Sequence, residues 1–149
     1  MKICLVCSHG GHYTETLQIL EAFKGHQVFF ATYHSPREGE VCNIAPAYLT
    51  DNIGYSIFRM VKSFFWSFKI LRLEKPDVVL SLGSEIAVPF IYLGKLMGIR
   101  TIFLESWCRV ENLSLSGRLV YPLVDAFWVQ WPQLLEVCSS KAKYRGAVI

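Results

Sequence analysis

Short apolar segments rich in β-branched and aromatic residues recur along the chain and alternate with longer amphipathic segments. The short segments predict strands at residues 2–7, 27–32, 77–82, 100–104, 126–130 and, with a weaker pattern, 144–149. The longer segments have the period of a helix and lie at residues 12–23, 53–74, 85–97 and 131–139. Strands that alternate with helices pair in parallel through right-handed crossovers. The pattern therefore predicts the α/β class: a single Rossmann-like domain with a mostly parallel sheet and helices on both faces.

Two stretches lack either period. Residues 35–52 contain Pro36, Gly39 and Pro46 among charged residues, which predicts a loop or a weak strand near residues 47–50. Residues 107–117 follow a predicted strand, and loops after parallel strands carry the ligand sites of this architecture. The second stretch is therefore a candidate for function.

The composition fits one compact domain that spans residues 1–149, because 52% of the residues are apolar and only 18% are charged. A net charge of +3 is too small for a general nucleic-acid-binding protein, so no nucleic acid is expected as a partner. The number of cysteines, five, is odd, and Cys4 and Cys7 fall in a predicted strand, where they would point to opposite faces. We therefore expect reduced cysteines and no metal site.

We expect a cytoplasmic protein. The first apolar run breaks at residues 8–11, which is too early for a signal peptide. The longest apolar stretch, residues 86–104, is interrupted by Lys95 and Arg100 and contains Pro89 and Gly98, so it does not meet the criterion for a membrane-spanning helix. A strand–helix–strand unit explains this stretch better.

The turn after the first predicted strand has the composition of a binding site. Gly10 and Gly11 let the backbone approach a ligand, and the next helix N-terminus, close to Ser8, offers unpaired N–H groups to an anion. The turn lacks the third glycine of the GxGxxG dinucleotide motif, and the chain contains no GxxxxGK[ST] phosphate loop. No nicotinamide or other cofactor is therefore expected.

His12 follows this turn, with Thr14 and Glu15 within one helical step. An imidazole at this position is a candidate base, able to take the proton of an attacking hydroxyl group. A histidine that merely caps the helix is the alternative. The turn alone does not decide between the two interpretations.

Two later turns repeat this pattern. Glu85 follows a small-residue turn and is expected in the first turn of a helix, where it either faces the same cleft as the first turn or is stabilised by the helix dipole. Glu105 ends the next strand, and it either contacts substrate or pairs with Arg109. The candidate substrate-binding residues are accordingly Ser8, Gly10, Gly11, Glu15, Gly83, Ser84, Glu85, Glu105 and Arg109.

The helical segment at residues 55–73 carries four cations and no acidic residue. On a helical wheel, the face expected in the core holds Ile57, Met60, Val61, Phe64, Phe68 and Leu71. On the opposite face the cations Arg59, Lys62, Lys69 and Arg72 alternate with Phe58, Trp66, Ile70 and Leu73. Such a surface suits anionic lipid headgroups. A protein interface would use the same patch, but the single sign of charge favours the membrane.

Taken in order along the chain, these motifs resemble those of the bacterial capsule and exopolysaccharide glycosyltransferase enhancer proteins. The residues that carry the resemblance are 8–12 with Glu15, 76–79, 83–89, 105–106, 109–110, 113–119, 121–122, Asp125 and 129–131. That family is similar to the membrane-anchoring subunit of the two-part UDP-N-acetylglucosamine transferase of the dolichol pathway. Its fold corresponds to the N-terminal, acceptor-binding half of GT-B transferases, including the lipid-intermediate N-acetylglucosaminyl transferase of peptidoglycan synthesis.

The resemblance implies a subunit that is not catalytic alone. A second glycosyltransferase chain would carry the nucleotide-sugar site, while this chain would bring an undecaprenyl-type lipid-linked acceptor at the inner face of the cell membrane. In the single-chain relatives the histidine of the first glycine turn is a base candidate, and it corresponds to His12. His9 departs from the family pattern by adding a bulky side chain beside the turn, and the spanning helix of the eukaryotic relative is not predicted here.

Two other interpretations stay open. In the first, the chain is a scaffold whose partner holds every catalytic group. In the second, it is a free-standing domain that binds a small nucleotide.

Overall fold

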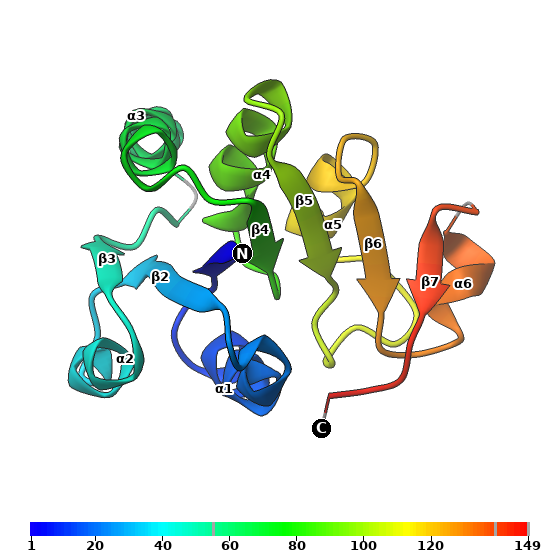
Figure 1. Ribbon diagram of the computed structural model, residues 1–149. Coiled ribbons are helices and arrows are strands. Elements are labelled where there is room, and N and C mark those ends of the chain that lie inside the picture. Colours follow the sequence, from blue (N-terminus) through cyan, green and yellow to red (C-terminus); the bar gives the residue numbers. More distant parts are fainter. Residues whose placement is uncertain (55, 139, 149) are drawn as a thin grey trace.

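The computed structural model describes residues 1–54, 56–138 and 140–148 and has one parallel sheet at its centre (Figure 1). The strands of the described residues are β1 (Lys2–Val6), β2 (Gln27–Tyr33), β3 (Ala47–Thr50), β4 (Val78–Ser81), β5 (Arg100–Leu104), β6 (Ala126–Val129) and β7 (Ala142–Tyr144). They pair in the order β3-β2-β1-β4-β5-β6-β7, and every neighbouring pair is parallel. The chain thus runs outward from β1 to β3, returns to β4 on the other side of β1, and continues outward to β7.

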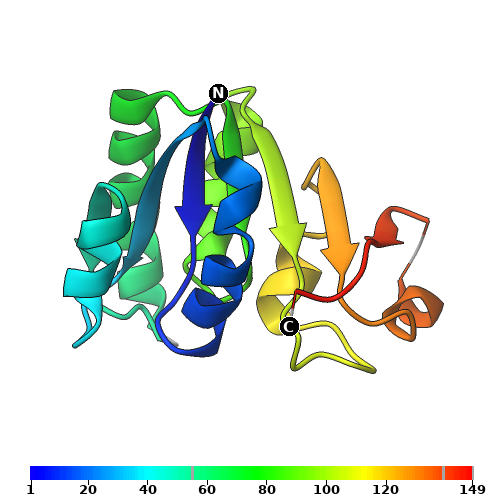
Figure 2. The same cartoon turned by 60° about the horizontal axis from the view of Figure 1, so that its bottom comes forward.

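Helices cover both faces of this sheet (Figures 1 and 2). On one face lie α1 (Gly11–Gln18), the 3₁₀ helix η1 (Leu20–Phe23) and α2 (Glu38–Ile44). On the other face lie α3 (Ile57–Glu74), α4 (Ala87–Leu96) and α5 (Leu115–Val120), and the short α6 (Leu134–Val137) packs beside β7. The predicted α/β class, parallel sheet and Rossmann-like layers are confirmed.

Two apolar clusters, one on each face of the sheet, hold the layers together. Alternate residues of β1 divide between them: Cys4 and Val6 join the cluster with α3 and α4, whereas Leu5 and Cys7 join the cluster with α1 and α2. A central strand is buried on both sides because helices cover both faces. Cys4 and Cys7 therefore point to opposite faces, as predicted, and burial raises the pKa of the Cys7 thiol to about 11.

Two helices form in stretches predicted to be irregular. α2 forms because Val41 and Ala45 bury their side chains against the sheet. α5 begins after Ser114, whose hydroxyl oxygen accepts a hydrogen bond from the Gly117 N–H and so caps the helix. Neither the packing nor the cap produces a long periodic pattern in the sequence.

The remaining predicted elements are present, but the helix predicted at residues 12–23 is divided into α1 and η1, α3 begins four residues later than predicted, and the C-terminal elements differ. The weak strand predicted near residues 47–50 is confirmed as β3. β7 lies at Ala142–Tyr144, ahead of the strand predicted at residues 144–149, and α6 is shorter than the helix predicted at residues 131–139. Residues 55, 139 and 149, which belong to three of the predicted elements, lie outside the described residues.

The helical-wheel prediction for α3 is correct for Met60, Phe64 and Leu71, which pack in the core, and wrong for several other residues. Ile57, Val61 and Phe68, predicted to be buried, are 83%, 51% and 42% exposed. Trp66 and Ile70, predicted on the surface, pack against the core instead. Apolar character alone therefore did not identify the packed side of this helix.

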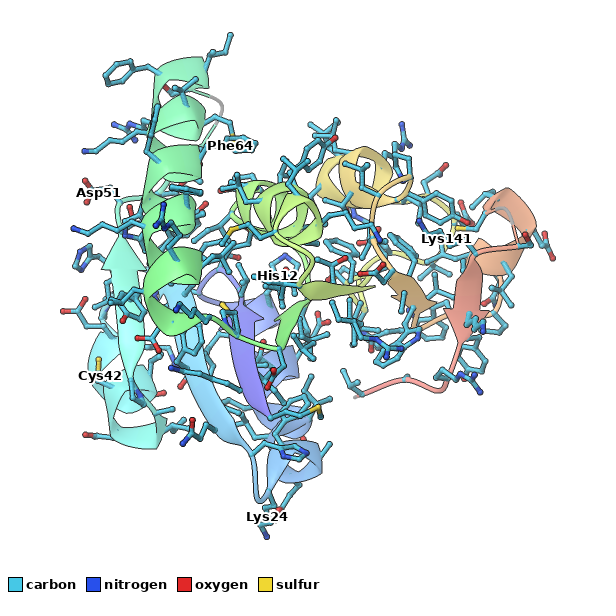
Figure 3. All side chains as sticks on the ribbon, turned by 45° about the horizontal axis from the view of Figure 1, so that its top comes forward. His12, Lys24, Cys42, Asp51, Phe64 and Lys141 are labelled. Atoms are coloured by element: carbon cyan, nitrogen blue, oxygen red, sulfur yellow. The ribbon has the colours of Figure 1, made fainter. Side chains whose placement is uncertain are left out.

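Two serines explain the error. Ser63 and Ser67 are buried on α3, which packs against α4. Small side chains let two helix backbones approach closely. Phe64 lies on the side of α3 toward α4 (Figure 3), where its ring packs against Tyr92, whereas Ile57, Val61 and Phe68 are exposed. Among the described residues, no helix combines the length and the apolar character needed to cross a bilayer.

Candidate functional site

The strand order reverses between β1 and β4, and open α/β sheets bind ligands at such a switch point, beyond the carboxyl ends of the strands. The turns after these two strands meet there. A Cβ atom on Gly83 would lie 2.7 Å from Cε1 of His12, so the imidazole ring rests directly on the glycine backbone. Gly83 and Ser84 both have positive φ angles, of 111° and 75°. Only a residue without a side chain fits at Gly83, both because of this angle and because of the ring above it.

His12, the candidate base, lies in the first turn of α1 and is half-buried. The N-cap position of α1 is Gly10, and no side chain caps this helix, so His12 does not act as its cap. Nδ1 of His12 is buried and has no hydrogen-bond partner among the described residues. A ring nitrogen that is free of bonds within its own chain suits proton transfer to or from a bound molecule.

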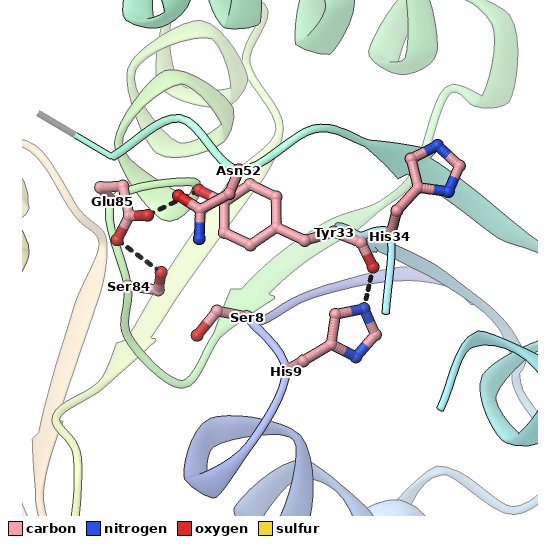
Figure 4. A pocket seen from close by; sticks show the side chains of 7 residues that line it. All are labelled: Ser8, His9, Tyr33, His34, Asn52, Ser84 and Glu85. Atoms are coloured by element: carbon pink, nitrogen blue, oxygen red, sulfur yellow. Dashed lines mark hydrogen bonds between the residues drawn. The ribbon is translucent and has the colours of Figure 1, made fainter. Parts of the chain in front are cut away.

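A cavity of about 270 Å³ opens on the β2 side of the switch point (Figure 4). Its lining comes from the ends of β1, β2 and β3 and from the turn after β4, and consists of Ser8, His9, Tyr33, His34, Asn52, Ser84 and Glu85. The structure therefore brings three of the predicted binding residues, Ser8, Ser84 and Glu85, into one pocket.

Two hydroxyl groups orient Glu85 in this pocket. Tyr33 Oη donates to Oε1 at 2.9 Å, and Ser84 Oγ donates to Oε2 at 2.8 Å. Glu85 precedes α4, which begins at Ala87, so it does not lie in the first helical turn as predicted. Burial of Tyr33, and next the charge of Glu85, raise the pKa of the tyrosine, so its hydroxyl group keeps its proton and donates. Of the two interpretations of Glu85, the structure supports a side chain that faces the shared cleft.

His9 forms another wall of the pocket. Its Nε2 contacts the carbonyl oxygen of Tyr33, while its Nδ1 is buried without a partner in the described part of the chain. Burial, and next the Arg37 cation, lower the pKa of His9, which favours the neutral ring at pH 7. The residue that departs from the family pattern thus lies in the pocket.

Glu15 lies elsewhere, in a buried polar network at the ends of β5 and β6. Its Oε1 accepts from Ser106 Oγ at 3.0 Å, and its Oε2 accepts from Gln130 Nε2 at 2.8 Å. The N–H of Trp107 is shared by both oxygens, at 3.4 and 3.3 Å. Glu15 is only 2% exposed, so this placement does not support the prediction that it contacts substrate.

Glu105 belongs to the same network and is fully buried. Its Oε1 accepts from the Ser106 N–H at 3.0 Å, and its Oε2 accepts from the N–H and hydroxyl of Ser114 at 2.9 and 3.1 Å. Arg109 is exposed and forms none of the ion pairs found among the described residues. Neither interpretation of Glu105 is therefore supported, because the carboxylate holds the loop after β5 by hydrogen bonds.

Sequence reasoning missed Tyr33, His34 and Asn52, which line the pocket from the ends of β2 and β3. Polar residues directly after predicted strands were the available signal, since the carboxyl ends of parallel strands share one edge. Asn52 was missed because it ends the stretch of residues 35–52, which was predicted to be irregular. The same reasoning missed Phe65, which is 74% exposed on the outer side of α3.

Sequence comparisons connect the chain with a family of oligosaccharide biosynthesis proteins. A family model described as "Oligosaccharide biosynthesis protein Alg14 like" matches residues 40–148. The UDP-N-acetylglucosamine transferase subunit ALG14 of Homo sapiens is 30% identical, in an alignment that covers 100% of this chain and 83% of the relative. The subunit of the same name from Rattus norvegicus is 40% identical over 100 residues, which are 63% of this chain and 46% of the relative. The chain thus matches about half the length of the rat relative.

Solved structures share the fold at low sequence identity. MurG of Acinetobacter baumannii matches 99% of this chain with 45% of its own, at a TM-score of 0.80 and 18% identity. UDP-GlcNAc 2-epimerase of Neisseria meningitidis matches 99% of this chain with 46% of its own, at a TM-score of 0.73 and 16% identity. The chain therefore has the fold of one half of a GT-B protein, as predicted. With the family model matched over most of its length, the chain belongs to the Alg14-like family of oligosaccharide biosynthesis proteins.

Proposed function

We propose that the chain is the acceptor-side, membrane-facing subunit of a two-chain glycosyltransferase, with a second chain that holds the nucleotide sugar. Family membership carries this proposal, because the relatives are named as subunits of a UDP-N-acetylglucosamine transferase. The site supports it as well: the half-buried His12 and the polar pocket lie at the edge of the sheet where a facing domain would complete a cleft.

In this function, a hydroxyl group of the lipid-linked acceptor attacks the anomeric carbon of the nucleotide sugar. The bond from that carbon to the nucleotide breaks, and the nucleotide leaves with the electron pair. His12 takes the proton of the attacking hydroxyl group on a ring nitrogen. The backbone N–H groups that follow Gly10 and Gly11, at the start of α1, stabilise phosphate oxygens. Glu15, Glu105 and Arg109 have no direct contact with substrate in this scheme.

The first experiment is co-expression with a candidate transferase-like chain from the same organism, followed by affinity purification and an assay with nucleotide sugar and lipid-linked acceptor. Activity is expected only when both chains are present. An isolated chain that turned over nucleotide sugar at the rate of the complex would contradict the proposal. Nucleotide binding without any partner would favour a free-standing nucleotide-binding domain.

A second experiment decides between participation and a pure scaffold. His12→Ala should lower kcat of the assembled complex by about 10²–10⁴-fold, the usual contribution of a general base. His26→Ala is the matched control, since His26 is exposed on the loop before β2. Full activity of the His12 variant complex would show that the partner supplies every catalytic group.

We further propose that the outer side of α3 lies on the membrane. Phe58 and Phe65 are 80% and 74% exposed there, beside the exposed cations Lys62, Lys69 and Arg72. None of these three cations belongs to an ion pair found in the described residues. Exposed aromatic side chains enter the headgroup region, and each cation near an anionic surface contributes about 1 kcal/mol.

Co-sedimentation with vesicles that contain phosphatidylglycerol tests this surface. The double variant Phe58→Ser with Phe65→Ser should lower the partition coefficient at least tenfold, because two large apolar groups no longer leave water. Leu96→Ser is the control, because Leu96 is 82% exposed but lies at the far end of α4. A double variant that keeps vesicle binding and loses the partner would identify the patch as a protein interface instead.

The cellular setting follows from the motif resemblance. We propose that the polymer is a capsule or exopolysaccharide, that the acceptor lipid is of the undecaprenyl type, and that the subunit acts at the inner face of the cell membrane. Assays of the two-chain complex with undecaprenyl-linked and dolichol-linked acceptors test the type of lipid directly. A clear preference for the dolichol lipid would contradict an acceptor of the undecaprenyl type.

A further inference from the structure

We propose that the pocket beside the switch point binds one neutral sugar ring of the acceptor, with Glu85 and Tyr33 as the residues that select for it. The proposal rests on the acceptor-side function given above and assigns a substrate class to a definite set of side chains. Its residues Tyr33, His34 and Asn52 lie outside every motif of the sequence (Figure 4).

The charge of the pocket favours a neutral occupant over a phosphate group. Glu85 is the one carboxylate among the lining residues, and the lining contains no lysine or arginine. A phosphate placed against Glu85 would be repelled by its charge. A sugar hydroxyl group, by contrast, donates a strong hydrogen bond to a carboxylate.

The unused hydrogen-bonding capacity also matches a sugar ring. Each oxygen of Glu85 accepts one hydrogen bond, from Tyr33 or from Ser84, and can accept another. Asn52 uses Oδ1 to accept from the Gly54 N–H at 2.8 Å, which leaves its NH₂ group for a ligand. The lining thus offers both hydrogen-bond donors and acceptors, as the hydroxyl groups of a sugar require.

The size of the cavity limits the ligand. At about 270 Å³ it lies just below the range of about 300–1,000 Å³ that encloses a drug-sized molecule. One sugar ring suits this space better than a complete nucleotide sugar. The anionic remainder of the substrate would then extend toward the glycine turns.

Tyr33 acts as a positioning residue for Glu85. It is 3% exposed, and its buried hydroxyl group fixes Oε1 at 2.9 Å. A carboxylate held in advance loses little freedom when a ligand binds, which favours affinity and selectivity.

Asn52 lies just ahead of α3, so a sugar in the pocket would sit near the end of α3 that carries the exposed Ile57 and Phe58.

The test is calorimetric titration of the full chain with three citronellyl diphosphate probes that carry N-acetylglucosamine, glucose or no sugar. At least one sugar-bearing probe should bind about tenfold more tightly than the sugarless probe. Tyr33→Phe and Glu85→Gln should each remove this preference and leave the affinity for the sugarless probe unchanged. Tyr48→Phe is the matched control, since it removes a hydroxyl–carboxylate bond to Glu74, at the opposite edge of the sheet.

Several results would overturn the proposal. They are equal binding of all three probes, an equal loss for all three in the variants, or no binding of any probe to a chain with an unchanged circular dichroism spectrum. Competition by UDP-N-acetylglucosamine at matching affinity would assign the pocket to the donor sugar instead. Because this test needs no partner, a failure to form the two-chain complex would refute the proposed function and leave the sugar pocket standing.

Discussion

Two groups of polar side chains lie at the carboxyl edge of one sheet and differ in what they do. On the β2 side, Glu85 is partly exposed in a cavity and keeps hydrogen-bonding capacity for a ligand. On the β5 and β6 side, Glu15 and Glu105 are buried and accept hydrogen bonds from their own chain only. In the sequence, Glu15 and Glu85 follow glycine turns and Glu105 follows a predicted strand, so all three were candidate binding residues. Exposure and spare hydrogen-bonding capacity, and not residue type, separate a binding group from a structural one.

The largest effect expected is the loss of stability in Glu105→Ala. The variant leaves the buried N–H of Ser106 and the half-buried N–H of Ser114 without their acceptor, at a cost of about 3 kcal/mol in the free energy of unfolding. Glu85→Ala should cost about 1 kcal/mol, because water can reach that site. Urea unfolding of both variants measures the difference. Equal losses would remove the distinction between the two groups.

A smaller effect is expected for an added methyl group beside Glu105, in the buried polar network. A Cβ atom on Gly117 would collide with Oε2 of Glu105 and lie 3.0 Å from Ser114 Oγ. Gly117→Ala should therefore cost about 1–3 kcal/mol. Gly11→Ala, whose Cβ would meet nothing within 4 Å, should be neutral or slightly stabilising. Thermal unfolding of both variants measures the difference. A neutral effect of Gly117→Ala would contradict the dense packing of this network.

At the open site, Gly83→Ala should lower activity as well as stability. The added methyl group meets the His12 ring at 2.7 Å and displaces it, which should lower kcat of the reconstituted complex at least tenfold. Gly25→Ala is the control for backbone strain alone, because Gly25 also has a positive φ, of 82°, but an empty surrounding. Equal activity of the two variants would show that the contact with His12 has no catalytic role.

The smallest effect concerns a fourth carboxylate, Glu74, at the opposite edge of the sheet. Hydrogen bonds from Lys2, and next from Tyr48, lower the pKa of Glu74 below its ordinary value of 4.5. A lowered pKa adds stability above the ordinary value, and this stability is lost as pH falls through the folded-state pKa. Glu74→Gln should therefore lower stability by under about 1 kcal/mol at pH 6, and the difference from the native chain should shrink toward pH 3. A difference that does not change with pH would rule out this linkage.

Particular residues show how far sequence reasoning reached toward the site. The two glycine turns were found because their residue types restrict the backbone, and the structure brings both to the switch point. Tyr33 and Asn52 were missed because nothing local marks a residue whose neighbour in space is far along the chain. Tyr33 and its partner Glu85 are 52 residues apart.

Glu15 and α3 show the opposite error, in which a local pattern was assigned the wrong surroundings. The partners of Glu15, Ser106 and Gln130, are 91 and 115 residues away, so nothing near it in sequence indicated a closed network. On α3 the wheel placed Ile57, Val61 and Phe68 in the core, and all three are exposed. The packed side includes Ser63 and Ser67, whose small side chains let α3 approach α4 closely.

The sequence by itself determined the strands, most helices, the parallel sheet and the two glycine turns. These features depend on residue periodicity and on backbone freedom, which act over a few neighbouring residues. Only the tertiary structure decided which carboxylate faces a cavity, which are closed in, and which side of α3 meets water. Those outcomes depend on burial and hydrogen bonding between segments that the fold alone brings together.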